Sequence, residues 1–242
     1  MSLIYPQWSV PAGVSACSTT RTGGVSAAPW DSFNLGDHVG DAPDSVQANR
    51  ERLVRQGAMP TMPVWLEQVH GTRVIELTGE QPLCRRADAA WTCKPGVVCA
   101  VMTADCLPVL FTSVSGKQVA AAHAGWRGLC GGILEATVAA FRCPPEEVIA
   151  WLGPAIGPGA FEVGPEVRMA FIAQNVSDEA AFRPAGEKYY ADIWQLARGR
   201  LKRMGVRHIS GGDLCTHSGG EQFFSFRRDG VTGRMASLIW LI

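Results

Sequence analysis

Two histidines and a cysteine occupy the positions in this 242-residue sequence that are best suited to chemistry. His70 follows the apolar run V-W-L-E-Q-V and precedes Gly71. Cys106 lies between two strand-like runs, and His123 closes a third run before the turn A-G-W-R-G. Side chains at strand ends and strand-to-helix turns are held by a fixed backbone while they stay reachable. All three residues therefore lie where a fold can present reactive groups.

Neutral imidazole and thiolate are both good ligands of zinc, a borderline-soft ion. Two imidazoles and one thiolate leave the fourth position of a tetrahedral zinc site open to water or substrate. Each residue alone also has an ordinary role: Cys106 as a small buried hydrophobe, His70 and His123 as polar turn residues. Because the three are far apart in sequence and no two form a short ligand pair, residue chemistry alone leaves both interpretations open.

The elements that would position these residues follow from apolar periodicity and turn residues. Strands are predicted at 15–20, 64–71, 97–103, 107–112, 118–123, 148–153, 209–215, 223–228 and 234–242. Helices are predicted at 43–56, 130–141, 164–175 and 188–204. Asp41 is expected to cap the first helix. Strands outnumber helices without strict alternation, which favours one α+β domain over residues 1–242 with a mixed sheet.

Composition limits the class of protein. Hydrophobic residues make up 47% of the chain, enough for a large core, and 22 acidic residues balance 22 basic ones. That balance argues against nucleic acid as a partner but not against a small anion held by a few arginines. The first residues lack the basic start and apolar stretch of a signal peptide, and no apolar run approaches the roughly 18 residues that span a bilayer. We therefore expect a cytoplasmic protein without membrane partners, of undetermined oligomeric state.

Eight cysteines without a C-x-x-C pair are typical of reduced thiols rather than a disulfide framework. The seven apart from Cys106 are expected to lie mostly in the core, and Cys99 and Cys130 fit this best. Cys99 lies inside a predicted buried strand, and Cys130 lies on the apolar face of a predicted helix.

Other polar residues are candidates for substrate binding. Arg127 opens a predicted helix, where exposed N–H groups favour an anion such as phosphate. Arg227 is a second candidate, but on a strand it and Arg228 would point to opposite faces, so that at most one reaches the site. Asn34, in a glycine-rich loop, could touch a sugar. Asp105, as a strand neighbour of Cys106, should face away from it, which favours a structural role.

Five segments of the chain resemble motifs of the YfiH-like family: N-L-G-D-H-V-G-D (34–41), Q-V-H-G (68–71), T-A-D-C-L-P-V-L (103–110), A-A-H-A-G-W-R-G (121–128) and T-H-S-G-G-E-Q-F-F-S-F-R-R-D-G (216–230). The resemblance runs in order from near Arg21 to the C-terminus. It implies that His70, Cys106 and His123 bind a catalytic zinc, as the matching residues do in that family. It also implies the family fold, an α+β four-layer α/β/β/α sandwich with mixed sheets of the CNF/YfiH-like type.

The family has been labelled laccase-domain or polyphenol oxidase, purine nucleoside phosphorylase and, for some bacterial members, peptidoglycan editing factor. The resemblance implies a zinc-dependent enzyme that phosphorolyses adenosine, inosine and methylthioadenosine and also deaminates adenosine. Its partners would be a purine nucleoside and phosphate. Zinc lowers the pKa of a bound water to about 7, which would provide the nucleophile for deamination.

Three alternatives remain. A Cys–His amide hydrolase acting on a peptidoglycan precursor would use Cys106 as nucleophile and His123 or His70 as base, without a metal. A copper-dependent polyphenol oxidase of the multicopper type needs many more histidines than the five present, so copper is less favoured than zinc. A non-catalytic binding module would keep the cysteines in its core. The sequence leaves open the physiological substrate, the choice between phosphate and water as nucleophile, the general acid or base and the native metal.

Overall fold

The strands form three sheets in the computed structural model, which describes residues 2–242. The four-stranded sheet has the order β1 (Leu3–Ile4), β2 (Val14–Thr19), β13 (Met235–Leu241) and β5 (Val98–Thr103). The six-stranded sheet has the order β12 (His208–Gly211), β8 (Val148–Leu152), β6 (Leu107–Ser113), β7 (Val119–Ala124), β4 (Ala89–Thr92) and β3 (Val74–Glu76). The three-stranded sheet has the order β10 (Phe182–Ala185), β11 (Lys188–Ala191) and β9 (Glu162–Val163).

Helices cover these sheets. They are α1 (Pro43–Gln56), α2 (Trp126–Gly131), α3 (Ile133–Ala139), α4 (Pro165–Gln174), α5 (Ile193–Met204) and α6 (Phe226–Asp229), with 3-10 turns η1 (Pro145–Glu147) and η2 (Val176–Ala181). In the part of the chain that the structure describes, no helix combines the length and apolar character needed to cross a membrane.

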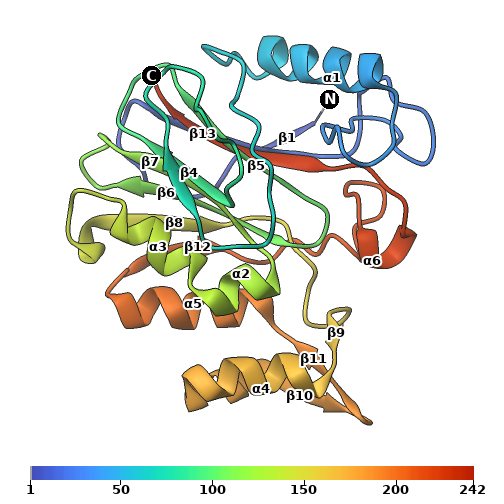
Figure 1. Cartoon of the computed structure of the whole chain (residues 1–242), viewed down its shortest axis with the longest axis vertical. Coiled ribbons are helices and arrows are strands. Elements are labelled where there is room, and N and C mark those ends of the chain that lie inside the picture. Colours follow the sequence, from blue (N-terminus) through green and yellow to red (C-terminus); the bar gives the residue numbers. More distant parts are fainter. Residues whose placement is uncertain (1) are drawn as a thin grey trace.

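The two larger sheets pack face to face, and the alternation of side chains along each strand shows why. On β13, Ile239 faces the core between the sheets, whereas Leu238 faces the core beneath α1. On β6, Leu110 joins the core between the sheets and Val109 joins the core under α3 and α5. Figure 1 shows the resulting order, with α1 on one side of the paired sheets and α2, α3 and α5 on the other. The predicted α/β/β/α sandwich is confirmed, and its six-stranded sheet is mixed, since β3–β4 and β8–β12 are parallel pairs.

Two predicted strands are wrong. Residues 223–228 contain a loop and the start of α6, because the Ser225 hydroxyl caps that helix by accepting the N–H of Arg228. The apolar pattern of that segment reflects burial of two phenylalanines rather than pairing in a sheet. Residues 64–71 make only isolated bridges, and the backbone N–H groups at the end of this segment donate to the carboxylate of Asp88.

The helix predicted over 43–56 matches α1, and the one predicted over 164–175 contains α4, whereas the other two predicted helices differ from the structure. Asp41 lies one residue before the N-cap of α1, and its carboxylate accepts hydrogen bonds from neighbouring loops instead of capping the helix. The helix predicted over 130–141 belongs to α2 and α3, which are separated at Gly132, where φ is 102°. The helix predicted over 188–204 begins only at α5, because Asp192 caps it and the preceding residues form β11.

All eight cysteines are free. Among the seven apart from Cys106, the buried ones are Cys17, Cys99 and Cys130. Three more pack against the main core from half-buried positions: Cys93, Cys143 and Cys215. Cys84 is exposed. The prediction is therefore confirmed for Cys99 and Cys130, and six of the seven cysteines lie in the core or pack against it, with Cys84 as the exception.

Candidate metal centre

The side chains of His70, Cys106 and His123 converge where β6 and β7 meet at the end of the six-stranded sheet. Their ligand-capable atoms all lie within 4.8 Å of one another, and Cys106 Sγ is 3.7 Å from His70 Nε2. The two imidazole rings meet edge to face, with centroids 4.7 Å apart. Ligands of one tetrahedral zinc stand about 3.3–3.8 Å apart, so small side-chain rotations would bring all three onto one ion. The donor set and its spacing fit zinc.

Asp88 holds both histidines. Its carboxylate is fully buried, and Oδ1 lies 2.9 Å from His123 Nδ1. The same carboxylate accepts the backbone N–H groups of His70 at 2.8 Å, Gly71 at 2.7 Å and Val69 at 3.2 Å, which fixes a turn where His70 has a φ of 59°. Because Asp88 occupies Nδ1, His123 keeps Nε2 for a ligand, an arrangement common around zinc-bound histidines.

Asp105 fixes the backbone on the other side of the site. It has a φ of 90°, and its carboxylate accepts the Thr216 hydroxyl at 2.6 Å and the backbone N–H of Arg227 at 2.7 Å. Its carbonyl accepts the N–H of Ile156 at 2.9 Å. These bonds turn the Asp105 side chain away from the metal centre while Cys106 projects into it. The predicted structural role of Asp105 is confirmed.

The turn after β7 contains a glycine because no side chain fits there. A Cβ at Gly125 would lie 2.6 Å from His70 Cδ2 and 3.1 Å from Cys106 Sγ. A Cβ at Gly128, one turn into α2, would lie 2.9 Å from the carbonyl oxygen of Gly71. The glycines of A-G-W-R-G therefore let α2 pack directly against the segment that carries the first histidine.

The electrostatics of the three residues are coupled. Burial alone would raise the pKa of the Cys106 thiol, but the charge of His123 and hydrogen bonds from both histidines outweigh it and lower that pKa to about 6. Burial would lower the pKa of His123, but the Cys106 thiolate and Asp88 raise it to about 9. Without a metal, a negative charge on Cys106 and a positive charge on His123 therefore stabilise each other.

A cavity of about 860 Å³ opens onto these three side chains. Its apolar lining includes Trp65, Met102 and the exposed ring of Phe226, and its polar lining includes Gln68 and Arg234. The volume lies within the range that accommodates small organic ligands, about 300–1,000 Å³. A small organic molecule can therefore fit beside the three side chains.

None of the three predicted substrate residues lines this cavity. Arg127 is exposed, and its guanidinium stacks on Trp126, with its carbon 4.5 Å from the ring centroid. The side chain of Arg227 donates to the carbonyl of Glu162 at 2.8 Å, because this residue lies on α6 and not on a strand. Asn34 is fully buried, and its amide bonds the loop around it.

A family model described as multi-copper polyphenol oxidoreductase laccase matches residues 15–242. The chain belongs to this family, which includes the YfiH proteins. It is 62% identical over 240 residues to the purine nucleoside phosphorylase YfiH of Escherichia coli, and the match covers 99% of both chains. It is 54% identical to a purine nucleoside phosphorylase of Pseudomonas aeruginosa, with 98% of both chains covered.

Two solved structures share the fold. Protein NMB0706 of Neisseria meningitidis has a TM-score of 0.94 and 48% identity, covering 100% of this chain and 99% of its own. The hypothetical protein YfiH of Bacillus licheniformis has a TM-score of 0.90 and 31% identity, covering 95% and 93%. The family description mentions several coppers, but among residues 2–242 only one group of three or more suitable donors comes together. A multicopper centre needs many more histidines than this group holds.

Two residues at the candidate site of this YfiH-family chain are absent from the sequence-based predictions. Asp88 directly precedes the apolar strand β4. An aspartate at the start of such a strand is expected to be buried, and a buried carboxylate needs hydrogen-bond or ion-pair partners. That signal indicates a buried network but does not identify its partners, which lie 35 residues away at His123 and 18 away at His70. Arg234 directly precedes β13, and the pairing of Met235 with Thr103 brings it to the cavity.

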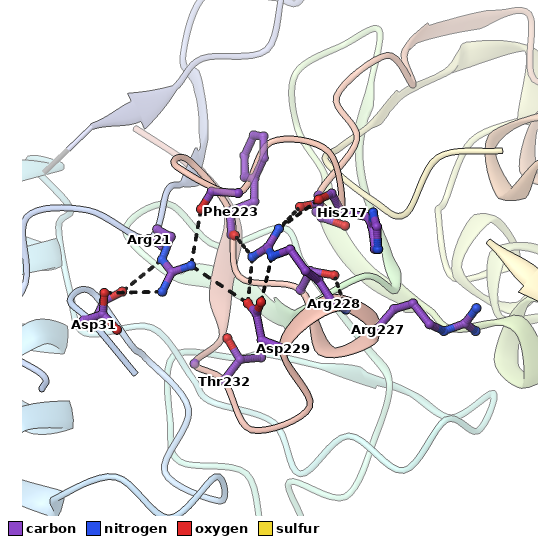
Figure 2. Close-up of polar contacts among 12 residues, drawn as sticks. Arg21, Asp31, His217, Phe223, Arg227, Arg228, Asp229 and Thr232 are labelled. Atoms are coloured by element: carbon purple, nitrogen blue, oxygen red, sulfur yellow. Dashed lines mark hydrogen bonds and ion pairs between the residues drawn. The ribbon is translucent and has the colours of Figure 1, made fainter. Parts of the chain in front are cut away.

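The last loop of the chain, residues 216–230, is held by Arg228. The guanidinium donates to three carbonyl groups, those of Thr216 at 2.9 Å, His217 at 3.0 Å and Phe223 at 2.9 Å. It also forms two hydrogen bonds to the carboxylate of Asp229, both 2.7 Å long (Figure 2). Through Thr216 this loop reaches Asp105, so Arg228 supports the backbone that presents Cys106.

Arg21 ties the same loop to the N-terminal part of the chain. It pairs with Asp31 at 3.4 Å and with Asp229 at 3.9 Å, as Figure 2 shows. Its guanidinium also stacks on Phe224, 4.7 Å from the ring centroid. We refer to Arg21, Asp31, Arg228 and Asp229 as the C-terminal clamp.

Proposed function

We propose that this protein is a zinc-dependent purine nucleoside enzyme that phosphorolyses adenosine, inosine and methylthioadenosine and deaminates adenosine. The observation that carries the proposal is the convergence of His70, Cys106 and His123 at a cavity of nucleoside size. The full-length identity of 62% to a relative named purine nucleoside phosphorylase supports the substrate class. Purine nucleoside and phosphate are the proposed partners.

Each component of the site would have a separate role. When bound, zinc supplies Lewis-acid activation of water or of an anionic oxygen. Asp88 fixes the ring orientation of His123 through Nδ1, which would leave Nε2 to bind the zinc. Phe226, which is 58% exposed along the cavity, offers an aromatic face to a purine ring.

Product analysis tests this proposal. Zinc-loaded protein should convert inosine to hypoxanthine only with phosphate, and adenosine to inosine without it. In His123→Ala one ligand is gone, so zinc content and both activities should fall together, because one site serves both reactions. His208→Ala, at an exposed position on β12 outside the cavity, is the matched control and should keep both. Full activity of His123→Ala would refute a metal centre at this position.

A Cys–His amide hydrolase is the second candidate, and one observation favours it. Cys106, His123 and Asp88 are linked in a chain of interactions in which a thiolate faces an imidazole oriented by a carboxylate. Such a chain activates a cysteine nucleophile without a metal. Release of an amino acid from a muramyl amide by zinc-stripped protein would support this function, and it would be lost in Cys106→Ser.

A further inference from the structure

The sheet register places an arginine at the metal centre. Met235 is the first residue of β13, and it pairs with Thr103 at the end of β5. β5 leads within three residues to Cys106. Arg234, just before β13, therefore lies at the end of the sheet where the centre forms, and it lines the same cavity as Cys106 and His123.

The guanidinium of Arg234 has no acidic partner within 4.0 Å among residues 2–242. Its Nη1 donates to the carbonyl groups of Thr232 at 3.1 Å and Gly233 at 3.0 Å. Its other two nitrogens, Nε and Nη2, have no hydrogen-bond partner in the described chain. By contrast, Arg50 at the same end of the molecule pairs with Asp37 at 3.2 Å.

A half-buried charge without a counter-ion is costly, which is why burial lowers the pKa of Arg234. The nearby charges of Cys106 and Asp105 offset this only in part. The free Nε and Nη2 groups lie along one edge of the guanidinium, the edge that donates two parallel hydrogen bonds to a carboxylate or phosphate. The free edge and the absence of an acidic partner within 4.0 Å in residues 2–242 both indicate an anionic ligand.

The loop at Asn34 holds this arginine in place. Asn34 Oδ1 accepts the backbone N–H of Arg234 at 2.8 Å and that of Gly36 at 2.9 Å. A Cβ at Gly36 would lie 2.8 Å from Cγ of Arg234, so the glycine backbone packs directly on the arginine stem. Asn34 thus positions an arginine of the cavity instead of contacting the ligand itself.

We propose that Arg234 is the phosphate-binding side chain of the site, held there by Asn34. Phosphate binding by Arg234 is independent of the proposed function, but a role of Arg234 in phosphorolysis rests on it. In phosphorolysis a phosphate oxygen bonds to C1′ of the ribose while the bond from C1′ to the purine nitrogen breaks. The purine leaves with the bonding electron pair and takes the proton that the phosphate loses. Arg234 would orient the phosphate for this attack.

Binding of inorganic phosphate to the zinc-loaded protein, measured by titration calorimetry without nucleoside, tests the proposal. Arg234→Met keeps an unbranched stem on Gly36 but no donors, and it should weaken phosphate binding about tenfold or more. Arg234→Lys keeps the charge without the two-donor edge and should fall in between. The matched controls Arg127→Met and Arg227→Met lie outside the cavity and should stay within about twofold of wild type. Zinc content should be equal in all four variants, which shows that the site is still folded.

Kinetics separate this inference from the proposed function. If the wild type phosphorolyses inosine, Arg234→Met should raise the KM for phosphate far more than the KM for inosine. An unchanged phosphate KM and unchanged phosphate binding in Arg234→Met would overturn the assignment and leave the proposed function standing. A third outcome is that the wild type binds phosphate but leaves nucleosides intact, while Arg234→Met no longer binds phosphate. In that case the nucleoside function fails and the assignment of Arg234 holds.

Discussion

The C-terminal clamp and the cavity around Arg234 both place arginines in partly buried surroundings, but they use the charge differently. In the clamp, Arg21 and Arg228 share the carboxylate of Asp229, and Arg228 also binds three backbone carbonyl groups. Arg234 bonds only two carbonyl groups of its own loop and has no acidic partner within ion-pair distance in residues 2–242.

The difference separates stabilisation from ligand binding. An arginine whose donors are all occupied stabilises the folded chain, because removing it leaves its partners without hydrogen bonds. An arginine with a free edge adds little to folding and keeps that edge for a ligand. Both regions lie beside the segment that carries Cys106: the clamp contacts it through Thr216 and Asp105, and Arg234 lines the same cavity as Cys106.

Replacing the clamp arginine should have the largest effect. In Arg228→Met the carbonyl groups of residues 216–230 and the Asp229 carboxylate lose their donors. We expect the free energy of unfolding to fall by about 2–4 kcal/mol, measured by urea denaturation. The change should also lower zinc affinity, because the loop supports the backbone at Cys106. Wild-type stability in Arg228→Met would contradict the structural role of the clamp.

The charges at the cavity, unlike those in the clamp, should change the reactivity of the Cys106 thiol. In zinc-free protein Cys106 should be alkylated by iodoacetamide as a thiolate, with the rate falling through a pKa of about 6 as the pH is lowered. Cys17, whose pKa is raised to about 12 by burial, is the internal control and should stay unmodified. Mass spectrometry of the modified peptides gives both rates. A midpoint near the ordinary thiol pKa of about 8.5 would show that the histidines do not stabilise the thiolate.

The acidic partner in the clamp should make a smaller contribution that depends on pH. Hydrogen bonds from Arg228 lower the pKa of Asp229, so its stabilising effect is present above the ordinary carboxyl pKa and is lost as the pH falls through the folded-state value. Asp229→Asn should cost about 1 kcal/mol at pH 7, measured by urea denaturation. The difference from wild type should shrink below about pH 4. A difference that is constant down to acid pH would argue against an ionised pair.

Replacing Arg234 should affect folding least. In phosphate-free buffer, Arg234→Met removes a half-buried charge that has no counter-ion. The free energy of unfolding should therefore change by less than about 0.5 kcal/mol, or increase slightly. The measurement is urea denaturation beside Arg228→Met under the same conditions. A loss as large as that of Arg228→Met would mean that Arg234 serves the fold and not a ligand.

The fold was largely predictable because its strands alternate cleanly or form continuous apolar runs. β5, β6, β7 and β13 all lie where the pattern places them. The short strands β1, β3, β4, β9, β10 and β11 lie outside the predicted strands. The two predicted strands that are wrong lie where local side-chain bonds override the pattern, at the Ser225 cap of α6 and at the Asp88 carboxylate beside residues 64–71. Such bonds depend on residues brought together by tertiary structure, which periodicity does not reveal.

The candidate site was predictable to a different extent for each kind of residue. His70, Cys106 and His123 lie in motifs, and the structure brings these three together. The substrate-binding predictions depended on residue type and local position, such as the helix start at Arg127, and Arg127 and Arg227 lie outside the cavity. Arg234 differs from them only in where the register of β13 and the Asn34 loop place it. The position of Arg234 is set by pairing between strands more than 130 residues apart in sequence, which no local pattern reveals.

The measurement that tests the central claim most directly is a zinc titration of metal-stripped protein with inosine phosphorolysis as the readout. The account predicts no activity without metal, recovery that reaches its maximum at about one zinc per chain, and no recovery in His70→Ala or Cys106→Ala. Metal analysis of each sample gives the stoichiometry. Full phosphorolysis by the stripped wild-type protein, or equal recovery in the variants, would contradict a zinc centre formed by His70, Cys106 and His123.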